Sequence, residues 1–262
     1  MTESGLTGRT AFIAGGSSGI NLTIAKRLAG EGMNVAVFSR SDEKIAKAVE
    51  ELQVINSECV GYTGDVRDLD AVKSAMSQAA VQLGSFDVLV SGAAGNFMAS
   101  AKDMSSNAFR AVIDIDLVGT FHVCKAAHEF MTKPGGTIIN VSAPQAFVAY
   151  PYQSHVNAAK AGVEMFTKTI ALEWGCDGLR ANTIVPGPIL ETEGMDRLLP
   201  SKDDQAVAGQ QMPVQRLGTK DDVANAAVFL ASDLSSFITG ATIPVDGGMM
   251  LLGPHLLKPS SK

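Results

Sequence analysis

A glycine-rich stretch near the start of the chain has the residue types and spacing to bind a dinucleotide. An apolar run over 10–14 leads directly into Gly-Gly-Ser-Ser-Gly-Ile, and a segment of helical spacing follows. Glycines let the backbone approach a pyrophosphate, and free N–H groups at a helix start attract its negative charge. Asn21 stands where a third glycine is typical, although asparagine tolerates unusual backbone angles. The pattern favours a dinucleotide site over an ordinary strand-to-helix turn, with these contact residues: Gly15, Ser17, Ser18, Gly19 and Ile20.

The end of the second apolar run, over 34–38, indicates which dinucleotide binds. An acid about 20 residues beyond the glycine loop would bind the ribose diol of NAD and repel a 2′-phosphate. Ser39 and Arg40 stand there instead, and a guanidinium group favours the phosphorylated cofactor. We therefore expect NADP(H). Asp65, after the third apolar run, is expected either to accept a hydrogen bond from the adenine amino group or to be an acid at the start of a helix.

Two ionisable residues lie among small or apolar neighbours, where a charged group is unusual. Asp116 belongs to a predicted helix over 107–127, and the positions at helical spacing from it hold no cation. Such surroundings prepare a carboxyl group to act as an acid or to orient a water, unless it is a hydrogen-bonded structural aspartate. Lys160 lies among alanines and a glycine, which would let a ligand come close. An exposed helix lysine is the alternative.

The elements that must position these residues alternate between short apolar runs and longer segments of helical spacing. Continuous apolar runs are typical of parallel strands buried on both faces, and no linker rich in Pro, Gly or Ser divides them. We predict one α/β domain over 1–253, a Rossmann-like doubly wound parallel sheet of seven strands with helices on both faces. A flexible tail should follow over 254–262, and 190–212 should be a mobile lid. The expected strands are 10–14, 34–38, 58–63, 86–91, 136–141, 181–185 and 242–245, and 20–30 and 158–174 are among the helices.

Composition narrows the function classes. The 262 residues are 46% apolar and carry a formal charge of -6, which fits a folded protein and leaves no basic excess for nucleic acid. No apolar run is long enough to span a membrane, and no spacing suggests a metal site. The cysteines Cys59, Cys124 and Cys176 are far apart and odd in number, so we expect a reducing compartment and a cytoplasmic protein.

Several motifs, in order along nearly the whole chain, resemble those of the short-chain dehydrogenase/reductase family. They are Gly15-x-x-x-Gly19, Gly64-Asp-Val66, Ala93-Ala-Gly95, Ala159-Lys160-Ala-Gly162, Pro186-Gly-Pro188 and Val245-Asp-Gly-Gly248. The family pattern places a tyrosine four residues before the lysine and a serine 13 residues before that tyrosine. Here Val156 and Ala143 occupy those positions, with Ser142 one residue away. The chain therefore lacks the phenol that serves as the acid in ordinary ketone reduction by this family.

A narrower resemblance points to the 2,4-dienoyl-CoA reductases, above all to the peroxisomal type, which lacks that tyrosine. It rests on Ala93-Ala-Gly-Asn-Phe97, Ser106-Asn-Ala-Phe109, the run over 113–121, His155 five residues before Lys160, and Thr192-Glu-Gly194. It implies that Asp116 and Lys160 are the catalytic pair and that Lys160 also holds the nicotinamide ribose. Further cofactor contacts would be Val66, Ala93, Pro186, Gly187 and Ile189. The implied acyl-CoA contacts are Arg67, Phe97, Ser105, Ser106, Asn107 and Arg197. The resemblance also implies a homotetramer.

Two other functions stay open from the sequence. The chain could reduce another activated alkene or a carbonyl, with Ser142 and a loop tyrosine such as Tyr152 supplying the acid, and His155 is a lesser candidate proton donor. It could also bind NADP(H) without catalysing any reaction, because loss of the phenol is how such a protein would arise.

Overall fold

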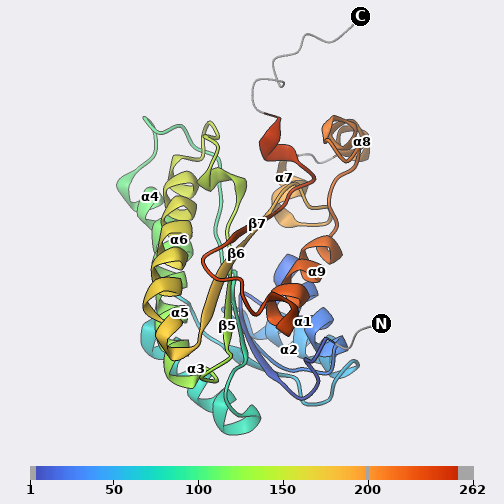
Figure 1. Cartoon of the computed structure of the whole chain (residues 1–262). Helices are drawn as coiled ribbons and strands as arrows, with labels where there is room; N and C mark the ends of the chain where they lie inside the picture. Colours follow the sequence, from blue (N-terminus) through green and yellow to red (C-terminus); the bar gives the residue numbers. More distant parts are fainter. Residues whose placement is uncertain (1–3, 199–200, 253–262) are drawn as a thin grey trace, which may run out of the picture.

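A parallel seven-stranded sheet forms the centre of the protein (Figure 1). The computed structural model describes residues 4–198 and 201–252, but not the side chains of 196–198, and the expected tail over 254–262 lies outside the described residues. The strands are β1 (Thr10–Ala14), β2 (Asn34–Ser39), β3 (Val60–Thr63), β4 (Val88–Ser91), β5 (Thr137–Val141), β6 (Arg180–Pro186) and β7 (Thr242–Val245). Their order across the sheet is β3-β2-β1-β4-β5-β6-β7, so the sheet winds outward in both directions from β1 and β4. The predicted fold class is confirmed.

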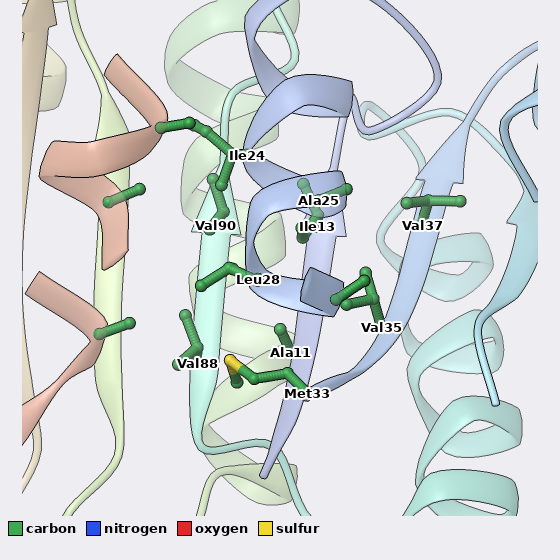
Figure 2. Close-up of a cluster of buried hydrophobic side chains, with 14 of the residues drawn as sticks. Ala11, Ile13, Ile24, Ala25, Leu28, Met33, Val35, Val37, Val88 and Val90 are labelled. Carbon is green, nitrogen blue, oxygen red and sulfur yellow. The ribbon is translucent and has the colours of Figure 1, made fainter. Parts of the chain in front are cut away.

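Helices cover both faces of this sheet. On one face lie α1 (Gly19–Gly30), α2 (Asp42–Gln53) and α9 (Lys220–Ala231), and on the other α3 (Leu69–Leu83), α5 (Gly119–Phe130) and α6 (Ser154–Glu173). Side chains alternate along each strand between two apolar cores. Ile13 of β1 packs with Ile24 and Leu28 of α1 (Figure 2), whereas Phe12 packs in the opposite core. Burial on both faces explains why the strands are continuously apolar.

The strands predicted over 10–14 and 242–245 match the observed bounds, and the other five differ by one or two residues at one or both ends. The strands expected over 58–63, 86–91 and 136–141 begin one or two residues later, and β6 is one residue longer at each end than expected. Phe86, for example, is buried but forms only an isolated parallel bridge with Met131, two residues before β4 begins. Hydrophobicity alone therefore does not mark where pairing starts.

The predicted single helix over 107–127 is divided. It consists of α4 (Ser106–Val112), a wide π-helical turn over Ile113–Val118, and α5. Asp116 lies in the π turn, and the Thr120 hydroxyl donates to the Asp116 carbonyl at 2.7 Å. Such wide turns are frequent at functional sites because they redirect side chains. The helix predicted over 158–174 begins one turn earlier, at Ser154.

The segment expected to be a lid contains two short helices, α7 (Glu193–Leu198) and α8 (Lys202–Gln211). Two ion pairs tie its beginning to the body of the protein: Glu191 to Lys220 at 3.0 Å and Glu193 to Lys44 at 3.6 Å. Met195 also packs against Met212 and Leu217 in a small apolar cluster. The described part of the segment is thus helical and anchored at its beginning, whereas α8 buries only Gly209.

Candidate active site

A cleft of about 730 Å³ opens at the carboxyl ends of β1, β2, β4, β5 and β6. In doubly wound sheets ligands bind at this edge, beside the point where the strand order reverses. The cleft is lined by every cofactor-contact residue predicted from the sequence. These are Gly15, Ser17, Ser18, Gly19, Ile20, Ser39, Arg40, Asp65, Val66, Ala93, Lys160, Pro186, Gly187 and Ile189.

The glycine loop lines the cleft and leads into the start of α1. Gly15 and Gly19 adopt left-handed backbone angles, with φ of 79° and 58°, which other residues rarely adopt. A Cβ atom on Gly15 would lie 2.8 Å from the Ala93 nitrogen, so no larger side chain fits. This shallow backbone cradle at a helix start suits a pyrophosphate.

At the end of β2, the residues facing the cleft are Ser39, Arg40, Ser41 and Lys44. No acid lies among them, and two cations do. Asp65 also lines the cleft, but its carboxylate is paired with Arg67, whose Nη2 lies 2.6 Å from Asp65 Oδ2. That hydrogen bond lowers the pKa of Asp65. Asp65 does not cap α3, because the cap is Asp68, which accepts from the first-turn amides.

Asp116 and Lys160 meet inside the cleft. Their side chains are 1% and 7% exposed, and Asp116 Oδ2 lies 3.3 Å from Lys160 Nζ. The other Asp116 oxygen, Oδ1, accepts from the Gly95 amide at 2.8 Å, and Lys160 Nζ donates to the Val141 carbonyl at 3.2 Å. Within the described residues, Oδ2 accepts no hydrogen bond. The π turn and α6 therefore bring together a buried carboxylate with an open lone pair and a buried ammonium group.

The position that would hold the family phenol is filled by the buried Val156, which packs with Val112 and Ala159. His155, the neighbouring residue, is fully buried, its ring lies 4.3 Å from that of Phe97, and it does not line the cleft. Burial lowers the pKa of His155, against the opposing charge of Asp116. A neutral imidazole behind the cleft wall is poorly placed to donate a proton.

Two hydroxyl groups in the cleft are alternative proton donors. Ser142 is buried and its Oγ has no hydrogen-bond partner in the described part of the chain. Tyr150 lines the cleft, with its hydroxyl 3.9 Å from Met249 Sδ, and burial raises the pKa of its phenol. Tyr152, the tyrosine suggested from the sequence, is 59% exposed and does not line the cleft. Both tyrosines lie in the loop between β5 and α6, where the sequence has no helix or strand periodicity. The sequence therefore did not indicate which of the two faces the cleft.

The residues predicted to contact the substrate are not gathered in this cleft. Ser105 and Ser106 line a neighbouring cavity of about 600 Å³ with Phe109, Arg110 and others, and Ser105 also caps α4. Arg67 is engaged with Asp65, and Phe97 rests on His155. Asn107 lines neither cavity. The side chain of Arg197 lies outside the described residues.

Sequence reasoning missed the role of Asn21 in the cleft wall. Its side chain is 9% exposed, and its Nδ2 donates to the Gly92 carbonyl at 2.8 Å. The only signal was its departure from glycine, which gave no indication of a partner 71 residues away.

Among the described residues, no three His, Cys, Asp or Glu side chains gather as a metal ion would require. No helix in the same part of the chain is both long and apolar enough to cross a bilayer.

Comparisons with known proteins agree with this geometry. The peroxisomal 2,4-dienoyl-CoA reductase of Arabidopsis thaliana, described as (3E)-enoyl-CoA-producing, is 40% identical over 97% of this chain and 89% of that protein. A probable 2,4-dienoyl-CoA reductase of Bacillus subtilis, described as (2E)-enoyl-CoA-producing, is 38% identical over 93% of this chain and 97% of that protein. A solved gluconate 5-dehydrogenase of Burkholderia cenocepacia, in complex with NADP and tartrate, superposes with a TM-score of 0.88 at 30% identity, covering 95% of this chain and 98% of its own.

A family profile described as enoyl-(acyl carrier protein) reductase matches residues 14–250. Profile, relatives, fold and cleft agree over nearly the whole chain, and the protein belongs to the short-chain dehydrogenase/reductase family of oxidoreductases.

Proposed function

We propose that the protein reduces 2,4-dienoyl-CoA thioesters to enoyl-CoA with NADPH, as a step in fatty-acid degradation. The observation that carries this proposal is the buried pair of Asp116 and Lys160 in the dinucleotide cleft, where Val156 replaces the phenol. Reduction of a conjugated thioester needs charge stabilisation and a proton at carbon, but no phenol. The relatives named as 2,4-dienoyl-CoA reductases support the same reaction.

The end of β2 supports NADPH as the cofactor. Arg40 and Lys44 line the cleft where a 2′-phosphate would lie, and the carboxylates near them are engaged by cations, Asp65 by Arg67 and Glu193 by Lys44. The glycine cradle fits the pyrophosphate. The solved relative that binds NADP supports this choice for the family.

The polar part of the reaction is assigned to Asp116 and Lys160. The glycine loop and Lys160 would hold NADPH, which when bound would supply the hydride that the far end of the conjugated thioester accepts. Lys160 Nζ then stabilises the negative charge that develops on the thioester oxygen. Asp116 Oδ2 orients a water that gives its proton to carbon, and solvent returns one proton to the hydroxide that remains. The Gly95 amide and the Val141 carbonyl hold the two side chains during this exchange.

The acyl-CoA is proposed to extend from this cleft towards the neighbouring cavity lined by Ser105 and Ser106. CoA carries three phosphates, so its site needs cations or backbone amides. Arg110, which lines that cavity, and Arg67, once released from Asp65, are cations that meet this need.

A substrate panel tests the reaction directly. Purified wild-type protein should oxidise NADPH with 2,4-hexadienoyl-CoA and act poorly on simple ketones and on 3-oxoacyl-CoA. NADH should serve less well than NADPH. Turnover of ketones but not of dienoyl-CoA would overturn the proposal, and tight NADPH binding without turnover of any acyl-CoA would identify a binding protein.

A second enzymatic function is favoured by one observation. Tyr150 and the unpartnered Ser142 hydroxyl both face the cleft, so a carbonyl reductase could take its proton from them. The ketone arm of the substrate panel decides between the two reactions.

We also propose that the protein is a homotetramer and that it works in the cytoplasm. The family resemblance implies that the helices predicted over 107–127 and 158–174 pair between subunits. The corresponding α5 and α6 expose large apolar side chains: Phe121, Met165 and Leu172. The particle mass in solution tests the assembly. All three cysteines are free, which is consistent with a reducing compartment.

A further inference from the structure

Asn21 occupies the place of a motif glycine, and its surroundings show what the larger side chain does. It belongs to the first turn of α1, directly after the glycine loop, and lines the cleft. Its Nδ2 donates to the carbonyl of Gly92, the residue that follows β4. The amide thus bridges two backbone segments that meet only in the folded protein.

The fit around Asn21 is tight on both sides. A Cβ atom on Gly92 would lie 2.3 Å from Asn21 Oδ1, and one on Gly15 would lie 3.0 Å from Asn21 Nδ2. The Gly92 amide is itself bound to the Ala14 carbonyl at 3.1 Å. Gly92 is therefore held from β1 through its N–H and from α1 through its C=O, and little room remains for it to shift.

The segment that starts at Gly92 also holds the proposed catalytic acid. Three residues further on, the Gly95 amide donates to Asp116 Oδ1 at 2.8 Å, and Asp116 Oδ2 faces Lys160. A displacement at Gly92 would therefore change where the Gly95 amide points. Outer partners of this kind orient the groups that contact the reaction centre, and they matter because small misplacements lower rates.

We infer that Asn21 is a positioning residue, which couples the cofactor's phosphate loop to the placement of Asp116 through the Gly92–Gly95 segment. The inference rests on the proposed function of Asp116. Phosphates bound on the glycine loop restrict the motion of the start of α1. Through its hydrogen bond to the Gly92 carbonyl, Asn21 restricts the motion of Gly92 in turn. A motif glycine at position 21 has no side chain with which to make this link.

Amide hydrogen exchange tests the coupling without any turnover. In the wild type, the amides of 92–95 should exchange more slowly with saturating NADPH than in the absence of NADPH. Asn21→Ala should lose most of this NADPH-dependent protection. Thr23→Ala is the matched control, because Thr23 lies on the same helix and donates only to Gly19 within the same turn. Equal protection in Asn21→Ala and wild type would overturn the inference.

Kinetics of Asn21→Asp provide a second, chemical test. The aspartyl oxygen replaces the amide nitrogen without a change of size, and it donates to Gly92 only when protonated. The backbone of Gly15 and Gly92 lies close to this side chain, and neither glycine carries a titratable group. At saturating NADPH and about pH 8, kcat of Asn21→Asp should be about tenfold lower than that of wild type. The ratio of the two kcat values should rise towards one as the pH falls towards the pKa of the new carboxyl group.

Three results would contradict the inference in this second test. They are a kcat ratio near one at all pH values, an equal pH-independent loss in Asn21→Asp and Asn21→Ala, or a rise in the KM for NADPH with kcat unchanged. The wild-type rate with dienoyl-CoA reports on the proposed function, whereas the exchange data and the ratios report on Asn21. Failure of one is therefore distinguishable from failure of the other.

Discussion

Asp116 and Lys160 face each other where water hardly reaches. A buried ion pair rarely stabilises a fold, because the loss of hydration offsets the attraction between the charges. Here the Gly95 amide and the Val141 carbonyl supply extra hydrogen bonds, yet Asp116 Oδ2 still accepts none within the described residues. A buried ion pair with one carboxylate oxygen left without a hydrogen bond fits a catalytic role better than a structural one.

The buried imidazole of His155 predicts how stability depends on pH. Burial lowers its pKa below the ordinary value of 6.5, so the unfolded chain binds that proton more readily than the folded protein. The free energy of unfolding should therefore fall as the pH drops from about 6.5 towards the lowered pKa. His155→Phe keeps a ring against Phe97 and cannot titrate at this position. Its free energy of unfolding should therefore fall less than that of the wild type between about pH 7 and about pH 5.

Urea unfolding of both proteins at the two pH values measures this difference. The other titrating groups are common to both, so only the difference between the proteins is attributed to position 155. A fall of the same size in both would mean that the folded protein protonates His155 as easily as the unfolded chain does.

The location of motif residues was predictable from the sequence where these residues directly follow a strand. The glycine loop and the end of β2 line the cleft as expected, because both follow directly from strand ends. Contacts across the fold were not predictable in the same way. The bond between Asn21 and Gly92, the inward turn of Tyr150 and the engagement of Arg67 by Asp65 depend on loops that sequence periodicity does not describe.

At the scale of elements, the π turn illustrates what periodicity misses. Apolar spacing predicted an uninterrupted helix, yet the turn over Ile113–Val118 is wide, and Asp116 lies within it. Gly119, at the start of α5, lies so close to Val66 that an added Cβ would be 2.6 Å from its side chain. This close approach involves a residue about 50 positions earlier in the chain, which local spacing does not reveal.

The ion pair between α2 and α7 makes a prediction about cofactor binding. Lys44 and Glu193 are about half and three-quarters exposed, so their pair contributes at most about 1 kcal/mol. A 2′-phosphate beside Arg40 would compete with Glu193 for Lys44. Glu193→Gln should therefore tighten NADPH binding by about two- to fivefold, in line with that energy, and change NADH binding less.

Fluorescence titration with each cofactor measures the two affinities. Glu191→Gln is the matched control, since Glu191 lies in the same segment but pairs with Lys220. Equal shifts for NADPH and NADH in the Glu193 variant would mean that Lys44 does not meet the phosphate.

At the scale of the whole molecule, the fold class follows from the alternation of buried runs and helices, whereas the strand order comes from the structure. Right-handed crossovers and a sheet covered on both faces leave few other arrangements. The substrate site follows less well, because it is built from loops and short helices beyond the strand ends. Ser105 and Ser106 accordingly line a cavity separate from the cofactor cleft.

The central claim is that Asp116 and Lys160 do the work of the missing phenol, and one measurement tests it most directly. NADPH oxidation with 2,4-hexadienoyl-CoA is followed in wild type, Asp116→Asn and Lys160→Ala, with Asp70→Asn as control for loss of an exposed carboxylate. NADPH binding and circular dichroism verify that each variant is folded. We predict that kcat falls by about hundredfold or more in the two pair variants and not in the control. A folded, NADPH-binding Asp116→Asn protein with wild-type turnover would contradict the account.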